Sequence, residues 1–320
     1  MFALLFPGQG SQQPGMGRFL VENFKLAGTT FEEASDAIGI DMKKLCFEGS
    51  IEELTLTENT QPALLTVGTA TERVLRTDFG VQGTIAAGHS IGEYGALVAA
   101  GVIPFAGAVK AVRTRGKAMQ NAVPVGQGGM VAVMGLDEKQ VNELCAYVES
   151  KSGKKPLSPA NFNSPGQIVI SGSAQAIEWM KANAKADEIW AENPPRLKLI
   201  PLTVSAPFHC TMMKPAEDEM RSFLNELPFS DAKFPVIQNL DAASHSKAAE
   251  LRENLIRQIS GPVRWAQSME TLKKTGTSKV IELGAGKVLQ GLLKKIDSEF
   301  FHVFNTNSLD DLKTIEISKS

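Results

Sequence analysis

Cysteine is scarce in this chain of 320 residues, and its three cysteines stand far apart. Cys46, Cys145 and Cys210 form neither a CxxC pair nor a Cys/His spacing of the kind that binds zinc. Small secreted domains often depend on several disulfides, and this sequence offers no such framework. The cysteine content therefore excludes a disulfide scaffold and a structural zinc site, and it favours a reducing compartment.

Excess charge and long apolar runs are also missing. The 33 Lys and Arg residues nearly balance the 35 Asp and Glu residues, so the net charge of −2 provides no basic field for nucleic acid. No stretch approaches the roughly 18 apolar residues of a membrane span, and the mean hydropathy is −0.07. The apolar residues 1–6 lack a basic region and run into Pro7, which predicts a first strand rather than a signal peptide. We therefore expect a cytoplasmic protein with no nucleic-acid or membrane partner.

The sequence does contain the alternation of short β-branched runs and helical periodicity that is typical of an α/β protein with a parallel sheet. The clearest unit spans residues 80–103, with a strand over 84–87, a turn over 88–92 and a helix over 93–100. The chain length agrees with two domains, or with one large α/β domain that carries an insertion.

The pattern changes after residue 127. Strands are predicted over 130–134, 157–161, 167–171 and 197–204, and helices over 137–150 and 174–185. The resulting order, βαββαβ, predicts a ferredoxin-like small domain over residues 128–198. Residues 1–127 and 199–320 would then form the α/β core.

A GxSxG pattern, Gly88-His89-Ser90-Ile91-Gly92, falls at the predicted junction of a strand and a helix. There a strained turn lifts the serine hydroxyl above the sheet. Ser90 and Glu93 also fit a capping box, in which the serine would only cap the next helix. A cap does not require glycine on both sides, whereas a strained elbow does. The sequence therefore favours Ser90 as a nucleophile.

A serine hydroxyl needs a base, and the chain has four histidines. His89 adjoins the serine and points elsewhere, His245 lies in a polar stretch, and His302 lies near the C-terminus. His209 follows the last strand of the inserted domain, where a proline-stiffened loop returns the chain to the core. Because a domain junction is the usual place of a cleft, we predict His209 as the base.

Arg115 is predicted to lie among apolar neighbours. On a helix over residues 106–120 it shares one face with Ala111, Val112 and Met119. A buried guanidinium stays charged and needs an anionic partner, which is either a carboxylate of the protein or a carboxylate of a ligand. The helix alone leaves both alternatives open.

Two glycine-rich segments fail the patterns of nucleotide-binding loops. Gln13 stands where the segment Gly8-Gln9-Gly10 would need the last glycine of GxGxxG, and Gly284-Ala285-Gly286-Lys287 lacks the upstream glycine and the Ser/Thr of a P-loop. Cys210 is not expected to pair with its neighbour His209, because adjacent side chains on an extended segment point to opposite faces. We expect no cofactor and no metal.

Six motifs together resemble the malonyl-CoA:acyl carrier protein transacylase family of bacterial type II fatty acid synthesis. They follow the family's order over nearly the whole chain: Pro7-Gly8-Gln9-Gly10-Ser11-Gln12, Gln61-Pro62-Ala63, Gly88-His89-Ser90-Ile91-Gly92-Glu93-Tyr94, Arg115-Gly116-Lys117-Ala118-Met119-Gln120, Asn161-Phe162-Asn163-Ser164-Pro165-Gly166-Gln167 and Ala206-Pro207-Phe208-His209. The resemblance implies a hydrolase-like α/β core with a short parallel sheet and a ferredoxin-like insertion.

The resemblance also implies a reaction and its residues. Ser90 would take a malonyl group from malonyl-CoA and pass it to the pantetheine thiol of acyl carrier protein, with His209 as the base. The backbone N–H groups of Gln9 and Ile91 would form the oxyanion hole, at a helix N-terminus that favours negative charge. Arg115 would hold the free carboxylate of the substrate through a two-pronged ion pair.

Three further residues complete the substrate site by resemblance, namely Met119, Asn161 and Phe208. Phe208 resembles the bulky residue by which related acyltransferase domains accept malonyl rather than methylmalonyl units. In the family a backbone carbonyl near a Pro-Val-x-Trp segment, here Pro262-Val263-Arg264-Trp265, orients the histidine, so a dyad replaces a triad. The chain departs from one family member at Gly261 and Phe208, which replace an asparagine and a serine.

Two other functions compete with this hypothesis. A serine esterase or thioesterase of α/β-hydrolase type would share the elbow, but it normally needs an acidic third member and an HGGG-like loop, and no HGGG occurs here. A non-enzymatic scaffold that binds CoA or an acyl carrier would use Ser90 only as a cap. We expect malonyl-CoA and acyl carrier protein as partners of a monomer. Lysines such as Lys287, Lys294 and Lys295 either attract an acidic carrier or only form a solvated helix face.

Overall fold

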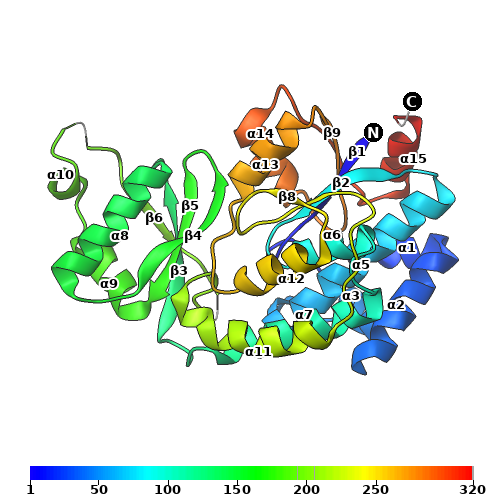
Figure 1. Ribbon diagram of the computed structural model, residues 1–320, viewed down its shortest axis with the longest axis horizontal. Coiled ribbons are helices and arrows are strands. Elements are labelled where there is room, and N and C mark those ends of the chain that lie inside the picture. Colours follow the sequence, from blue (N-terminus) through cyan, green and yellow to red (C-terminus); the bar gives the residue numbers. More distant parts are fainter. Residues whose placement is uncertain (193, 205, 319–320) are drawn as a thin grey trace.

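The computed structural model describes residues 1–320 except 193, 205 and 319–320. It is an α/β fold with a mixed six-stranded sheet and a separate antiparallel four-stranded sheet (Figure 1). The smaller sheet and its helices lie at one end of the molecule, and the rest of the chain packs around the larger sheet. The predicted α/β class is confirmed.

The larger sheet is built on the apolar N-terminal segment. Its order is β10 (His302–Phe304), β9 (Lys279–Glu282), β1 (Phe2–Phe6), β2 (Gly83–Gly88), β7 (Val236–Ile237) and β8 (Ser244–His245). Neighbours from β10 to β7 run parallel, and β8 runs antiparallel to β7. The predicted parallel sheet therefore ends in one antiparallel strand at this edge, because the short connection over 238–243 allows a hairpin but no crossover.

Both faces of the larger sheet are buried, which explains the continuous apolar run of β1. Phe2, Leu4 and Phe6 contribute to one core, and the alternate residues Ala3 and Leu5 contribute to the other. The helices of this part are α1 (Arg18–Asn23), α2 (Lys25–Ile38), α3 (Met42–Glu48), α4 (Ile51–Thr55), α5 (Thr57–Asp78), α6 (Gly92–Ala99), α7 (Phe105–Asn121), α11 (Lys214–Glu226), α12 (Ala248–Arg257), α13 (Trp265–Lys274), α14 (Val288–Asp297) and α15 (Leu309–Ile317).

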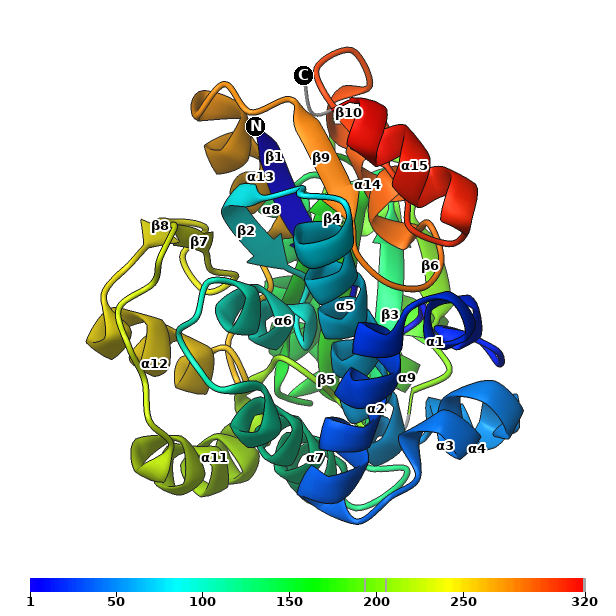
Figure 2. The ribbon, with the colours of Figure 1, turned by 90° about the vertical axis from the view of Figure 1, so that its right-hand side faces the viewer.

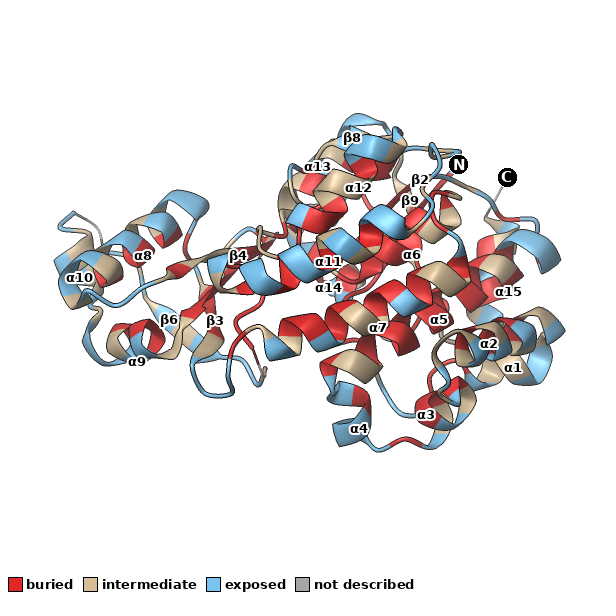
Figure 3. Cartoon of the chain, turned by 60° about the horizontal axis from the view of Figure 1, so that its bottom comes forward, coloured by how far each residue is buried: buried red, intermediate tan, exposed pale blue. Residues whose placement is uncertain are grey.

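Three of these helices form the interior on one side of the sheet. Figure 3 shows buried residues concentrated along α5, α6 and α7, and Figure 2 shows α5 passing in front of the sheet beside α2 and α6. Although α5 is 22 residues long, no helix in the described part of the chain is long and apolar enough to cross a membrane.

The smaller sheet has the order β4 (Leu157–Ser164), β5 (Gln167–Ser173), β3 (Gly128–Met134) and β6 (Lys198–Pro201). The helices α8 (Glu138–Ser152), α9 (Ala174–Asn183) and α10 (Ala186–Ile189) accompany it, and it has an apolar core of its own. β4 continues past its predicted end at 161, so Asn163 lies on a strand rather than in a turn. β6 is shorter than the predicted strand over 197–204, and α10 was not predicted.

Main-chain hydrogen bonds join the smaller sheet to the larger part. The N–H of Val263 donates to the carbonyl of Ala160 at 2.8 Å, and the N–H of Phe162 donates to the carbonyl of Val263 at 2.9 Å. These bonds attach β4 to the segment between α12 and α13. They hold one wall of the candidate site against the other.

Candidate active site

Ser90 lies in the turn between β2 and α6, in the left-handed region with φ 52°. The flanking glycines are required for space: a Cβ on Gly88 would lie 2.0 Å from the carbonyl carbon of Gly92, and a Cβ on Gly92 would lie 2.1 Å from the carbonyl oxygen of Phe6. The serine makes no capping hydrogen bond to α6. The capping-box alternative is therefore wrong, and the turn has the strained geometry of an elbow.

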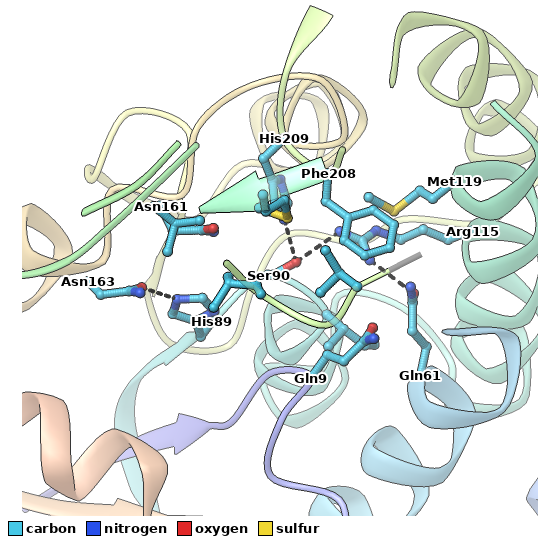
Figure 4. A pocket seen from close by; sticks show the side chains of 15 residues that line it. Gln9, Gln61, His89, Ser90, Arg115, Met119, Asn161, Asn163, Phe208 and His209 are labelled. Carbon is cyan, nitrogen blue, oxygen red and sulfur yellow. Dashed lines mark hydrogen bonds between the residues drawn. The ribbon is translucent and has the colours of Figure 1, made fainter. Parts of the chain in front are cut away.

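The hydroxyl of Ser90 faces the imidazole of His209. Ser90 Oγ and His209 Nε2 are 2.8 Å apart (Figure 4). On the other side of the ring, His209 Nδ1 lies 2.9 Å from the main-chain oxygen of Gln258. A carbonyl oxygen can only accept, so Nδ1 carries the proton and Nε2 presents its lone pair to the serine. This tautomer is the one that can take a proton from Ser90 Oγ.

His209 is held as a neutral base. Burial lowers its pKa to about 3, and the positive charge of Arg115 lowers it in the same direction. The residue is 4% exposed and has φ 60°, so its backbone is also in the left-handed region. At neutral pH the imidazole therefore has a free lone pair directed at the nucleophile.

Arg115 reaches the same hydroxyl from α7 and is 1% exposed. Its NH1 donates to Gln61 Oε1 at 3.0 Å, and its NH2 donates to Gln258 Oε1 at 2.9 Å and to Ser90 Oγ at 3.1 Å. Its Nε has no hydrogen-bond partner within the described chain. No carboxylate pairs directly with it among the described residues, so the internal ion pair considered above is absent and the charge remains available to an anion.

These groups border a cavity of about 180 Å³ between the two sheets. The cavity wall contains all eight residues that the sequence analysis assigned to a site: Gln9, Ser90, Ile91, Arg115, Met119, Asn161, Phe208 and His209 (Figure 4). The smaller sheet contributes Met130, Asn163 and Val169. The structure therefore brings together residues that lie up to two hundred positions apart in the chain.

Two backbone N–H groups at the cavity wall face the space above Ser90 without a partner in the described part of the chain. The N–H groups of Gln9 and Ile91 have no acceptor among the residues that the structure describes. Gln9 follows β1 and Ile91 precedes α6, at the carboxyl ends of adjacent parallel strands. Donors in this position can stabilise a negative oxygen that develops above Ser90.

Sequence reasoning missed several polar residues around the nucleophile. Asn239 Oδ1 accepts from the N–H of Ser90 at 2.7 Å, and Asn239 Nδ2 donates to the carbonyl of Gly88 at 2.7 Å. A signal for Asn239 did exist, because it is the second residue after β7 and the carboxyl ends of parallel strands meet at a ligand site. Gln258 has no comparable signal, because only the packing of α12 brings it to the site.

Two other positions were only partly anticipated. His89 points away from Ser90, as expected, and its Nε2 lies 2.8 Å from Asn163 Oδ1 on β4. The carbonyl that holds His209 belongs to Gln258, four residues before Pro262. The segment 262–265 itself binds β4 through Val263.

The lysines expected to attract a carrier are exposed and lie outside the cavity wall. Lys287 precedes α14, and Lys294 and Lys295 lie in its last turn. Lys295 Nζ donates to Gln167 Oε1 of β5 at 2.8 Å. Lys295 therefore contacts the smaller sheet, and none of the three lysines contacts Ser90.

Comparison with known proteins gives concordant matches. The acyl transferase domain family matches residues 3–302. A malonyl CoA-acyl carrier protein transacylase of Salmonella typhimurium is 45% identical over 295 residues, which is 92% of each chain.

Two solved structures cover almost the whole chain. An acyl carrier protein S-malonyltransferase of Vibrio cholerae superposes with a TM-score of 0.90 at 41% identity, over 98% of this chain and 99% of that one. A malonyl-transacylase solved in complex with a type II polyketide synthase acyl carrier protein superposes with a TM-score of 0.91 at 40% identity, over 99% of both chains.

Proposed function

This chain belongs to the acyl transferase family, and we propose that it transfers a malonyl group from malonyl-CoA to the pantetheine thiol of acyl carrier protein and so supplies fatty acid synthesis. The observation that carries this proposal is the environment of one oxygen atom. Ser90 Oγ lies 2.8 Å from the base His209 and 3.1 Å from the guanidinium of Arg115. A nucleophile, a base and a binding group for a carboxylate therefore meet at one point.

In the first half of the reaction Ser90 Oγ attacks the thioester carbonyl of malonyl-CoA, and His209 Nε2 takes the hydroxyl proton. The carbonyl oxygen becomes negative and accepts hydrogen bonds from the backbone N–H groups of Gln9 and Ile91. The C–S bond then breaks, the proton on His209 passes to the sulfur, and CoA leaves as a thiol. The product is a malonyl ester of Ser90.

The second half reverses these steps with a different thiol. His209 removes the proton from the pantetheine thiol of acyl carrier protein, and the sulfur attacks the malonyl-serine carbonyl. The ester C–O bond breaks, and the proton returns from His209 to Ser90 Oγ. The carbonyl of Gln258 keeps the imidazole in the same tautomer throughout, so no acidic third residue is needed.

Substrate choice rests on the remaining residues of the cavity. Arg115 would hold the malonyl carboxylate by charge-assisted hydrogen bonds, for which its unpartnered Nε–H is available. Met119, Asn161 and Phe208 line the same cavity, and we assign the bulk of Phe208 to the preference for malonyl over methylmalonyl.

The site lies between two units, for which we keep the predicted limits. Residues 1–127 and 199–320 are proposed as a hydrolase-like core and residues 128–198 as a ferredoxin-like domain. The strand order β4-β5-β3-β6 supports the second assignment, and so does the element order β3-α8-β4-β5-α9-α10-β6, which is βαββαβ with one additional short helix. The smaller sheet itself continues to Pro201, because the whole of β6 pairs with β3. We further propose a cytoplasmic location, since the three cysteines are free and buried, and we keep the expected monomer as the default oligomeric state.

Intact-mass measurement tests the function directly. After incubation with malonyl-CoA the protein should gain the mass of one malonyl group, and addition of acyl carrier protein should remove it. Ser90→Ala should form no adduct and should unfold at the same temperature as the parent, because Ser90 is not part of the packed core. Normal transacylation by Ser90→Ala would exclude the proposed nucleophile.

The same experiment separates the competing functions. A thioesterase would release free malonate without acyl carrier protein, and a scaffold would bind malonyl-CoA without any covalent adduct. Only the transferase retains the adduct until a thiol acceptor is added.

A further inference from the structure

A carboxylate that the reaction itself does not use is buried beneath the serine turn. Glu93, in the first turn of α6, is 0% exposed. Its carboxylate accepts three hydrogen bonds, from Gln238 Nε2 at 2.9 Å, the main-chain N–H of Asn239 at 2.8 Å and Gln258 Nε2 at 3.1 Å. A buried carboxylate is costly unless its oxygens are satisfied, so its retention under the nucleophile requires an explanation.

Gln258 connects this carboxylate to the reacting groups. Its Oε1 accepts from Arg115 NH2 at 2.9 Å, and its Nε2 donates to Glu93 and, at 3.1 Å, to the carbonyl of Ser90. A reversed amide would place Nε2 against a guanidinium N–H and Oε1 against a carboxylate oxygen. Both contacts would be repulsive, so Glu93 and Arg115 together allow only one orientation of this amide.

Asn239 forms a second connection. The main-chain N–H of Asn239 donates to Glu93, and the Asn239 side chain binds the N–H of Ser90 and the carbonyl of Gly88. The serine turn is strained and therefore depends on its neighbours to keep its shape. Glu93 thus acts on the turn from below through Asn239 and on the guanidinium through Gln258.

We propose that Glu93 is a positioning residue for acyl transfer, whose charged carboxylate orients Gln258 and Asn239 and thereby aligns Ser90, His209 and Arg115. The inference rests on the proposed function, because it concerns the efficiency of that reaction. The ionised form is the active one, since a protonated carboxyl would lose acceptor strength toward all three N–H groups.

The surroundings of Glu93 place the ionisation of its carboxyl group near neutral pH. Burial raises the pKa of Glu93 to about 7, and its hydrogen bonds and Arg115 oppose the shift. The other titratable groups that face it are Arg115, Tyr94 and, through Gln258, His209. Burial raises the pKa of Tyr94, Arg115 stays cationic, and His209 stays neutral with its pKa of about 3. Glu93 is therefore the member of this group that changes charge between about pH 5.5 and 8.5.

The test follows malonyl-enzyme formation by rapid quench and intact mass, with malonyl-CoA below saturation. This half-reaction avoids the titration of the acceptor thiol and reports ionisations of the free enzyme. The rate of the parent protein should decrease as the pH falls below the pKa of Glu93, and this decrease is the acid limb of its pH–rate profile. Glu93→Gln keeps the shape of a neutral Glu93, so it should be slower by about ten- to a hundredfold at about pH 8 and converge with the parent at about pH 5.5. A purely structural role would lower the rate by the same factor at every pH.

Two further variants keep the inference testable if Glu93→Gln does not fold. Gln258→Met retains the main-chain carbonyl for His209 but removes the side-chain amide, so its rate should also lose the acid limb. Because both variants interrupt the same connection, the double variant Glu93→Gln/Gln258→Met should be no slower than the single variants. Gln61→Met is the matched control, because Gln61 also holds Arg115 but does not touch Glu93. It should be slower and keep the acid limb.

The outcomes distinguish this inference from the proposed function. The role of Glu93 is overturned, and the function is left intact, if the parent protein forms the adduct with no acid limb. The same holds if its pH–rate profile is parallel to that of Glu93→Gln or Gln258→Met. Loss of the acid limb in Gln61→Met also overturns it. If the parent forms no adduct, both the function and the inference are wrong.

Discussion

Arg115→Ala should distinguish malonyl transfer from acyl transfer in general. The guanidinium is buried beside Ser90 Oγ, and its protein partners are the neutral amides of Gln61 and Gln258 and the serine hydroxyl. A carboxylate that enters the cavity would therefore meet a cation with no competing anion in direct contact. The variant removes that cation and leaves the carboxylate in an enclosed site without a partner.

The size of the effect follows from this burial. Truncation of one partner in a buried, hydrogen-bonded charge pair typically costs about 2 to 5 kcal/mol. At about 1.36 kcal/mol for each factor of ten, kcat/KM for malonyl-CoA should fall by roughly 30- to 5,000-fold. Much of that loss would come from the stranded carboxylate rather than from the pair itself.

Acetyl-CoA provides the internal control, because it has no carboxylate to strand. Its kcat/KM should change little or increase. An increase is expected because the charge of Arg115, after burial, lowers the pKa of His209. Without that charge the imidazole becomes a stronger base toward Ser90.

Steady-state assays with both substrates measure this specificity ratio, and Arg115→Lys refines it. Lysine should rescue malonyl transfer only partly, because a compact ammonium cannot reproduce the planar two-pronged contact. Equal losses for malonyl and acetyl substrates, together with a lower melting temperature, would refute the reasoning and leave Arg115 with a structural role alone.

Two further predictions concern the elbow and the carrier surface. Gly88→Ala would place a Cβ 2.0 Å from the main chain of Gly92, so it should lower the free energy of unfolding, measured by urea titration, by about 3 kcal/mol. The control Gly291→Ala on α14 meets no atom within 4 Å and should raise that free energy by about 0.5 to 1 kcal/mol. Equal stability of the two variants would mean that the turn can rearrange to accommodate the Cβ. Reversing Lys287, Lys294 and Lys295 to Glu should slow the reaction with an acidic carrier at low salt, with a smaller effect at high salt and none for the control Lys25→Glu; unchanged carrier kinetics at low salt would place the docking surface elsewhere.

The fold class, the serine turn and the family could be predicted from the local pattern of residues in the sequence. Alternating β-branched and helical segments predicted the α/β class, because each element needs an apolar face that matches its own period. The glycines around Ser90 predicted a strained turn, since a side chain at either position would collide with neighbouring backbone. Six motifs in one order indicated the acyl transferase family, to which the chain belongs. The roles of the individual site residues stay predictions until the variants are measured.

Contacts between segments that are distant in the sequence could not be predicted from local patterns. The antiparallel edge of the larger sheet became apparent only where the short connection over 238–243 pairs β8 with β7, and the length of β6 only where it pairs with β3. The partners of Arg115 were left open because a helix face shows that a guanidinium is buried but not which residues surround it. Gln258 is the clearest case: an ordinary glutamine after α12 contacts Arg115, Ser90, His209 and Glu93 only because α12 packs against the serine turn. Residue type and spacing determined the elements and their chemistry, whereas the packing of elements far apart in the chain decided which polar groups meet, because those contacts have no fixed separation in sequence.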